Sequence, residues 1–234
     1  MHMIKTKPSL LKNLTTLTER KGMLLAVEGV DGSGKSTQLQ LVNNWLQSNG
    51  FATIVTTWAS SDNIKPLLKK IKRKEIIVPP EVFSLLHVAD FAERLETVVL
   101  PALKAGIVVL CDRYMYTALA RDVARGLPEK WVRRLYDFAL IPDMTFYFSV
   151  RPEVSFARKT GIPNFYEAGM DIGLNKNIRR SFELFQHRVI QSYESLVVRD
   201  HLILIDGEKD IFVTFPKVKK IIADAIHKKY KIHI

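Results

Sequence analysis

The fold of this chain is decided by one stretch, Gly29-Val30-Asp31-Gly32-Ser33-Gly34-Lys35-Ser36-Thr37. It matches the pattern G-x-x-x-x-G-K-[ST], in which glycines let the backbone wrap around phosphate oxygens with several N–H groups pointing inward. An apolar run at 23–27 precedes the motif and a helical pattern at 35–48 follows it, as the motif requires. We therefore expect all nine residues to form a phosphate-binding loop (P-loop), with the positive end of the helix facing the same anions.

Two side chains of the loop carry chemistry. Lys35 is expected to reach the β- and γ-phosphates of a nucleoside triphosphate, and the Ser36 hydroxyl to ligate Mg²⁺. The motif alone indicates triphosphate binding and does not separate kinases from ATPases or from regulators. The sequence contains no Asn-Lys-x-Asp guanine signature, which disfavours a GTPase.

Short apolar runs alternate with helical patterns through the rest of the chain. Strands are expected at 23–27, 52–55, 107–111, 144–150 and 202–205. Strands that are apolar throughout and separated by helices are typical of a parallel sheet covered on both faces. The pattern therefore predicts an α/β fold with right-handed crossover connections.

The expected helices cover 35–48, 80–104 and 115–140, with a final helix from Val213. Three glycines and a proline interrupt any periodicity over 160–177, which indicates a mobile or functional loop. A length of 234 residues fits one domain, which we expect at 21–234 after a polar N-terminal extension at 1–20.

Composition limits the partners. The net charge of +11 attracts polyanions or reflects a lysine-rich composition, and no aromatic interleaving indicates a surface for single-stranded nucleic acid. The single cysteine, Cys111, excludes a disulfide within the chain and favours a reducing compartment. Neither a signal-peptide pattern nor a membrane-spanning apolar window is found, so we expect a cytoplasmic protein with no membrane or nucleic-acid partner.

A second motif ends the third expected strand. The apolar run 107–111 leads directly into Asp112 and Arg113. Ligands of such sheets bind beyond the carboxyl ends of the strands, where an aspartate can hold Mg²⁺ and an arginine can bind phosphate through two hydrogen bonds. The alternative is an ordinary surface ion pair.

Three segments together resemble the thymidylate kinase family. They are Glu28–Gln38, the segment from Pro101-Ala102-Leu103-Lys104-Ala105-Gly106 to Asp112-Arg113-Tyr114, and Pro142–Phe148 with Pro152-Glu153-Val154. The resemblance covers most of 23–206. It implies a P-loop NTPase-type three-layer sandwich, with a five-stranded parallel sheet flanked by helices and a lid at about 158–177. It further implies phosphorylation of dTMP to dTDP with ATP and Mg²⁺, by a homodimer.

The resemblance also implies roles for single residues. Lys35 would hold the phosphates, Asp112 would serve Mg²⁺, Arg113 would bind between donor and acceptor phosphates, Asp31 would lie near the acceptor sugar and Thr117 near the base. Some members place an arginine in the P-loop where this chain has Gly32, and a subgroup with glycine there supplies it from the lid. Arg158 is then the first candidate, followed by Lys159 and Arg151, and the alternative is a solvated basic turn.

The chain departs from the family pattern on the acceptor side. Thr56-Thr57-Trp58-Ala59-Ser60-Ser61 stands in place of Arg-Glu-Pro-Gly-Gly-Thr, His87 and Phe91 in place of a Phe and an Arg, and Arg121-Asp122 in place of Tyr-Gln. His87 could stack on a base or be a half-buried structural histidine. We expect Arg94 to bind the acceptor phosphate, the alternative being a helix ion pair with Asp90. The acceptor-side candidates are Asp31, Trp58, His87, Phe91, Arg94, Arg113, Thr117, Arg121, Asp122 and Tyr166.

Other functions stay open at this point. A kinase of another nucleotide shares every motif above. A family-2 polyphosphate kinase also has an Asp-containing glycine-rich loop and an Asp-Arg pair, although Tyr114-Met115-Tyr116 does not resemble its Ser-Trp-Tyr. A non-catalytic nucleotide-binding regulator would need the loop but not Asp112-Arg113, an acceptor pocket or a lid.

Overall fold

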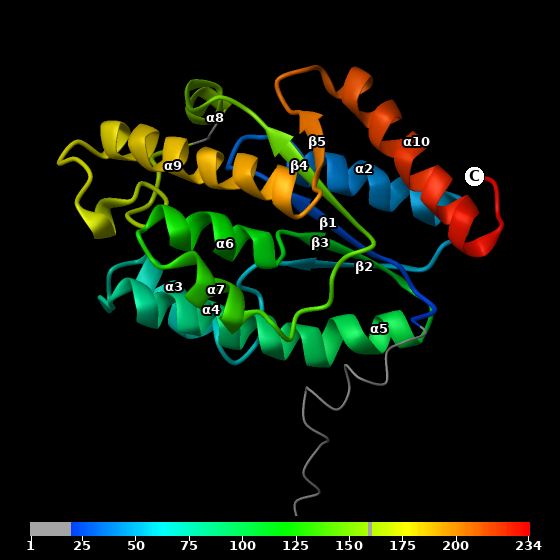
Figure 1. Ribbon diagram of the computed structural model, residues 1–234, viewed down its shortest axis with the longest axis horizontal. Coiled ribbons are helices and arrows are strands. Elements are labelled where there is room, and N and C mark those ends of the chain that lie inside the picture. Colours follow the sequence, from blue (N-terminus) through cyan, green and yellow to red (C-terminus); the bar gives the residue numbers. More distant parts are fainter. Residues whose placement is uncertain (1–19, 159–160) are drawn as a thin grey trace, which may run out of the picture.

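The computed structural model describes residues 20–158 and 161–234, so most of the expected N-terminal extension and Lys159 lie outside the described residues. A parallel sheet forms the centre, with the strand order β2-β3-β1-β4-β5 (Figure 1). Its strands are β1 (Leu24–Glu28), β2 (Thr53–Thr57), β3 (Val108–Asp112), β4 (Met144–Ser149) and β5 (Ile203–Asp206). The predicted five-stranded parallel α/β fold is confirmed.

Helices connect the strands and cover both faces of the sheet. They are α2 (Lys35–Ser48), α3 (Lys65–Lys72), α4 (Pro80–Arg94), α5 (Leu100–Lys104), α6 (Met115–Ala124), α7 (Glu129–Leu135), α8 (Pro152–Arg158), α9 (Ile178–Arg199) and α10 (Ile211–Tyr230). The expected helix at 80–104 contains a π-helical turn at Leu95–Val99, just before Pro101. Proline lacks the N–H that an α-helix would use there, so the ladder is adjusted locally. The expected helical region 115–140 divides at Gly126, whose φ is 95°.

Two hydrophobic cores lie on opposite sides of the sheet, because successive strand side chains point to opposite faces. Leu25 and Val27 of β1 pack in the core formed with α2 and α10. Leu24 and Ala26 pack in the core formed with α4, α5, α6, α7 and α9. Both faces are therefore buried, which explains why the strands are apolar throughout (Figure 1).

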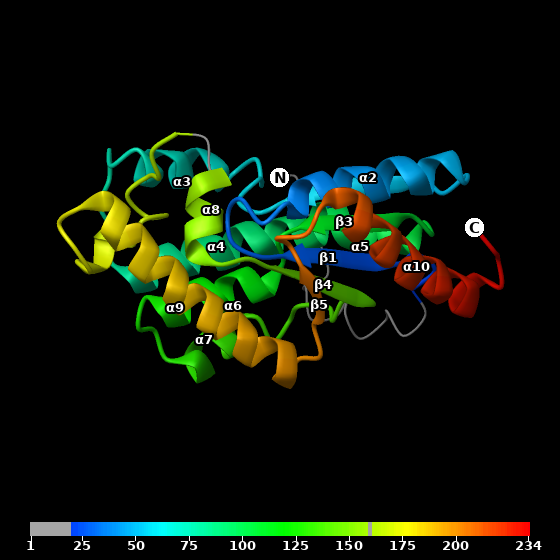
Figure 2. The ribbon, with the colours of Figure 1, turned by 90° about the horizontal axis from the view of Figure 1, so that it is seen from above.

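The carboxyl ends of the strands and the P-loop lie at one end of the molecule. Figures 1 and 2 show α3, α8 and the beginning of α9 gathered at that end. The segment expected as a lid connects α8 to α9 and contains a short 3₁₀ helix, η2 (Met170–Ile172). In the part of the chain that the structure describes, no helix is long and apolar enough to span a bilayer.

Candidate active site

The P-loop runs from Gly29 to the first turn of α2 and needs its glycines. The φ of Gly29 is 143° and that of Gly32 is 75°. A Cβ at Gly29 would lie 2.7 Å from the Phe148 carbonyl oxygen, and a Cβ at Gly32 would lie 2.7 Å from the Ser155 carbonyl oxygen. Ser155 also donates its hydroxyl to the Asp31 carbonyl at 2.6 Å, so α8 packs directly on the loop. Side chains at either glycine would push the loop away from β4 and α8.

Lys35 is the buried cation of this loop. Its Nζ donates to the Val30 carbonyl at 3.4 Å. Burial lowers the pKa of Lys35 to about 8, helped by the nearby Arg113 cation and opposed by Asp31 and Asp112. The charged form is thus under-stabilised by the protein alone, and an anion such as a triphosphate would complete its surroundings.

Ser36 and Asp112 bring the two expected metal ligands together. The Ser36 hydroxyl donates to Asp112 Oδ2 at 2.5 Å, and Asp112 Oδ1 is buried without a hydrogen-bond partner. A hydroxyl beside an under-satisfied carboxylate fits Mg²⁺, which prefers oxygen ligands and retains water and phosphate oxygens in its shell. Among residues 20–158 and 161–234 no group of three or more His, Cys, Asp or Glu side chains could hold a metal ion.

Arg113 joins the P-loop to the end of β3. Its backbone φ is 71°, a left-handed conformation that non-glycine residues seldom adopt. One guanidinium nitrogen donates to the Gly29 carbonyl at 3.0 Å and another to Asp31 Oδ1 at 2.5 Å. Burial opposes the charge, but Asp31 and then other acidic neighbours raise the pKa of Arg113 above its ordinary value. The guanidinium is consequently a fixed positive charge beside the loop.

Glu28, at the end of β1, holds the neighbouring elements through hydrogen bonds, a role that the sequence reasoning missed. It is fully buried, and its carboxylate accepts hydrogen bonds from the backbone N–H groups of Tyr114 and Thr117 and from the hydroxyls of Thr117 and Tyr193. Burial raises the pKa of Glu28, and these hydrogen bonds lower it. The network ties the first turn of α6 and helix α9 to β1. The only available signal was an acidic residue at the end of an otherwise apolar strand.

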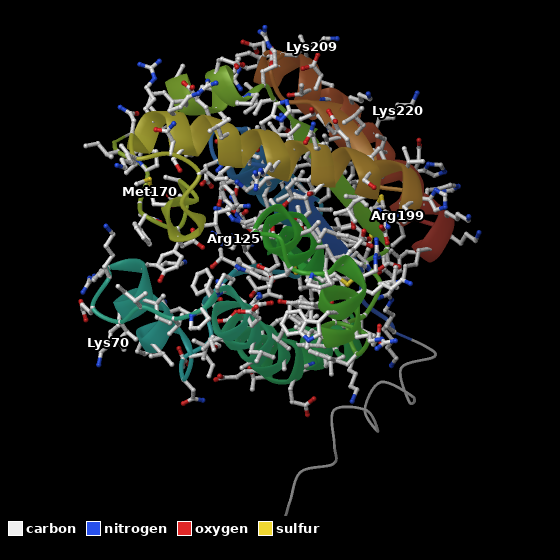
Figure 3. All side chains as sticks on the ribbon, turned by 60° about the vertical axis from the view of Figure 1, so that its left-hand side comes forward. Lys70, Arg125, Met170, Arg199, Lys209 and Lys220 are labelled. Atoms are coloured by element: carbon white, nitrogen blue, oxygen red, sulfur yellow. The ribbon has the colours of Figure 1, made fainter. Side chains whose placement is uncertain are left out.

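A pocket opens beside the P-loop, between α3, α4, α6 and the segment after α8. In Figure 3 the loop that carries Met170 lies opposite α3, the helix that carries Lys70. Trp58 stacks on His87 with ring centroids 5.4 Å apart, and Phe83 contacts both His87 and Tyr166. The pocket is lined by Asp31, Trp58, Lys72, Phe83, His87, Arg113, Thr117, Ala118, Arg121, Asp122, Arg125, Asn164, Tyr166 and Glu167.

Two titratable side chains of the pocket have shifted pKa values. Burial, reinforced by Lys72 and several arginines, lowers the pKa of His87 well below its usual value, so the ring is neutral, and its buried Nδ1 has no partner. Burial raises the pKa of Asp122 to about 6, although Ser84 donates its hydroxyl to this carboxylate at 2.6 Å. The pocket thus offers a flat neutral ring and a carboxylate, groups that suit the face and the edge of a base.

The structure brings most of the expected acceptor-side residues together and excludes two of them from the pocket wall. Phe91 is 2% exposed and packs in the core against Tyr114, Tyr136 and Phe138. Arg94 is also buried: it donates to Asp90 at 2.9 Å and to Thr56 at 3.2 Å. The ion pair with Asp90 forms as a buried pair and not as a surface one, while Arg94 Nη2 is buried without a hydrogen-bond partner. The acceptor-phosphate role of Arg94 stays a prediction.

Thr117 lines the pocket, but its hydroxyl donates to Glu28 at 2.6 Å. This contact directs the hydroxyl towards the strand. The sequence had not indicated Lys72, Phe83, Arg125, Asn164 or Glu167 as pocket residues. They come from the end of a basic helix, an apolar helix face and an irregular loop, none of which shows a motif.

Arg158 lies next to the P-loop and faces a different groove. A Cβ built on Gly32 would lie 3.3 Å from the Arg158 Cβ, and the guanidinium donates to the carbonyls of Gly207 and Glu208 at 2.5 and 3.1 Å. Arg151, a weaker candidate, pairs with Glu208 at 2.9 Å and is exposed. The groove is lined by Ser33, Gly34, Thr37, Gln38, Phe148, Arg158, Gly207, Glu208, Lys209, Asp210, Ile211 and Thr214.

Two sites therefore adjoin: the loop with its groove, and a pocket that shares Asp31 and Arg113 with the loop. With the parallel sheet, this pairing defines a P-loop NTPase of the kinase type. The thymidylate kinase family model matches residues 27–215. The chain belongs to the thymidylate kinase family, whose members are phosphotransferases.

Individual relatives support this assignment. A probable thymidylate kinase 2 of Saccharolobus solfataricus is 39% identical over 211 residues, which cover 88% of this chain and 98% of the relative. A probable thymidylate kinase of Pyrococcus abyssi is 31% identical, covering 75% of this chain and 91% of the relative. A thymidylate kinase of Exiguobacterium is 31% identical, covering 81% and 89% respectively. The likeness extends over nearly the whole length of these proteins.

Proposed function

We propose that this protein transfers the γ-phosphate of ATP to dTMP, giving dTDP and ADP. One observation carries the proposal: Arg113 and Asp31 are held by each other at the boundary between the P-loop and the pocket. A phosphate in the loop and a monophosphate in the pocket would both meet this pair. The names of the relatives support thymidine as the base and sugar of the acceptor.

The residues of this chain act by positioning and by electrostatics, because phosphoryl transfer leaves little covalent chemistry to the protein. Lys35 would neutralise charge on the transferring group, and Arg113 would hold donor and acceptor phosphates side by side. Arg158, whose Cβ lies near Gly32, would add a third positive charge at the donor. Mg²⁺, held by Ser36 and Asp112, would supply further charge neutralisation on the phosphates when bound.

The acceptor preference is tested by measuring ADP release with ATP and Mg²⁺ across deoxy- and ribonucleoside monophosphates. We expect dTMP to give the highest kcat/KM, with dUMP next and purine monophosphates poor. A clear preference for dGMP or dCMP would contradict the proposal, and ADP release without any acceptor would indicate an ATPase. Polyphosphate as the only donor is the matched control, and we expect no transfer from it.

The homodimer expected from the resemblance stays a prediction, and sedimentation velocity on the full chain would test it. The lid role of about 158–177 also stays a prediction. It concerns the described part of that segment, which already contacts the pocket through Tyr166 and Glu167.

A further inference from the structure

The cations that line the acceptor pocket are not all paired with carboxylates of the pocket. Four cations line it: Lys72, Arg113, Arg121 and Arg125. Arg113 is paired with Asp31 and Arg125 with Asp171. For the other two, Lys72 and Arg121, the structure of the described residues gives neither a side-chain hydrogen bond nor an ion pair. Neither cation is neutralised by an ion pair there, although the Arg121 guanidinium lies 5.6 Å from the Phe185 ring centroid, so the two are suited to a ligand with two negative charges.

Lys72 is held at this pocket by the packing of its helix. It is the last residue of α3, and the preceding turn buries Leu68 and Ile71 against Phe83 and Tyr166, two other residues of the pocket wall. The backbone at Lys72 is therefore fixed, while its side chain stays exposed to solvent at the mouth of the pocket. Its basic neighbour Lys70 lies on the outer side of α3 (Figure 3) and does not line the pocket.

The electrostatic surroundings of Lys72 point in the same direction. Loss of hydration at the pocket lowers the pKa of Lys72, and the charges of Arg121 and Arg113 lower it further. Glu167 and Asp31 oppose the shift. Lys72 also contributes to the lowered pKa of His87. Lys72 lines the same pocket as His87, Arg113 and Asp31, so its charge acts on the groups of this pocket. The cations repel one another, and an anion bound among them would relieve that repulsion.

We propose that Lys72 of α3 and Arg121 of α6 together bind the phosphate of the acceptor nucleotide. The proposal deepens the proposed function and rests on it, because it assigns a phosphate contact within the same acceptor pocket. A lysine ammonium is a compact charge that can approach a dianionic phosphate from the pocket mouth, whereas the Arg94 guanidinium is enclosed by Asp90 and Thr56. Lys72 thus fills the acceptor-phosphate role that the sequence assigned to Arg94.

The test separates phosphate binding from base binding. The affinities of dTMP and of thymidine, which lacks the phosphate, are measured by calorimetry for the full chain and for Lys72→Ala. We expect the variant to bind dTMP at least about tenfold more weakly, as for the loss of one charged hydrogen bond, and to bind thymidine as the wild type does. Steady-state kinetics should show a raised KM for dTMP and an unchanged KM for ATP.

Two further variants complete the design. Lys70→Ala removes a lysine from the outer side of the same helix and should leave both affinities unchanged. Lys72→Arg should retain most of the dTMP affinity. The inference is overturned if Lys72→Ala binds dTMP as tightly as the wild type. It is also overturned if the affinity for thymidine falls by the same factor as that for dTMP, since Lys72 would then contact the nucleoside and not the phosphate. Failure of the proposed function would show in the wild type itself, as absent phosphorylation of dTMP.

Discussion

At the scale of single residues, Lys35 carries the clearest expectation. Its ammonium is buried in the P-loop, where the only hydrogen bond that the structure gives it among the described residues goes to the Val30 carbonyl. We expect Lys35→Ala to lower kcat by at least about 100-fold, because a preorganised charge at the transferring phosphate is lost. Rapid-quench kinetics with ATP and dTMP would measure the loss, and the thermal unfolding midpoint would show whether the variant is folded. A folded variant with wild-type turnover would contradict the assigned role.

Asp122 leads to a prediction about pH. Its pKa is raised to about 6 by burial, with Ser84, Arg125 and Arg121 favouring the charged form and Asp171 opposing it. If the ionised carboxylate accepts the N3–H of thymine, protonation below pH 6 replaces a charged acceptor by a weaker neutral one. We therefore expect thymidine to bind more weakly as the pH falls through about 6. Thymidine is the ligand of choice because a monophosphate titrates near the same pH.

The variant Asp122→Asn provides the control. It should bind thymidine about tenfold more weakly at pH 7.5 and show no change in affinity between pH 5 and 7. The same substitution also affects stability. Because the folded pKa lies above the ordinary value of 3.8, ionisation costs stability as the pH rises from about 4 to 6, and the variant should lack that decline. Unchanged pH dependence of thymidine binding in the variant would refute the assignment of Asp122.

The residues that the sequence predicted well are those whose position follows from a local motif. The P-loop and Asp112-Arg113 lie where strands end, so their neighbours are fixed by topology. Phe91 and Arg94 do not line the pocket, because the direction of a helix face depends on tertiary packing: both are buried, and the neighbouring Asp90 Oδ1 accepts the Ser61 N–H. The sequence did not indicate Lys72, since sequence spacing does not show which lysine of a basic helix faces a pocket.

At the scale of elements, the segment between α8 and α9 is anchored more firmly than its glycine content indicates. Arg125 donates to Asp171 at 2.9 Å and to the Tyr166 carbonyl at 2.6 Å, and its guanidinium lies 4.6 Å from the Phe185 ring centroid. Figure 3 shows Arg125 beside this segment. The ion pair is almost entirely buried, with side chains 2% and 8% exposed. Any lid motion must therefore involve either this anchor or the part of the segment before it.

We expect Arg125→Ala to release the segment. Loss of one partner leaves the Asp171 carboxylate buried and unpaired, which costs about 3–5 kcal/mol in comparable cases. Urea unfolding would measure the lost stability, and hydrogen exchange should increase selectively over 164–172. The double variant Arg125→Ala/Asp171→Ala should lose less than the two single variants added together.

The matched control for this anchor is Arg180→Ala, which breaks an exposed pair with Glu183 on α9 and should change stability little. Uniformly increased exchange over the whole chain in Arg125→Ala would show general destabilisation. It would not support a local anchor.

Helices and strands were predictable where one hydrophobic periodicity dominates the sequence. The strands and α2 were found within one or two residues, whereas α9 was not assigned although it is long. Its buried positions, such as Phe182, Phe185, Val189 and Tyr193, are spaced for a helix but are separated by charged residues. The irregular segment before it has no period at all, and its conformation depends on Arg125, which is distant in sequence.

At the scale of the whole molecule, the donor groove illustrates what a sequence cannot display. Gln38 in the first turns of α2 donates to Thr214 of α10 at 2.5 Å. The backbone of Gly207 lies close to Ser33, because a Cβ added to Gly207 would be 2.8 Å from the Ser33 carbonyl oxygen. Residues from opposite halves of the chain therefore form one wall. The sheet order places them together, and no local pattern near residue 207 or 214 indicates a nucleotide site.

The sheet order also has a consequence for how this protein is made. The central strand β1, which leads into the P-loop, pairs Leu24 with Val109 of β3 and Leu25 with Met144 of β4. Neither partner exists when the ribosome synthesises β1, and Met144 is made only in the second half of the chain, so β1 stays unpaired with its apolar side chains uncovered during that interval. Such long-range pairings slow folding and expose aggregation-prone surface during that interval. The strand that leads into the P-loop is thus the first of the five sheet strands to be translated, and it gains its second neighbour only after β4 has been made.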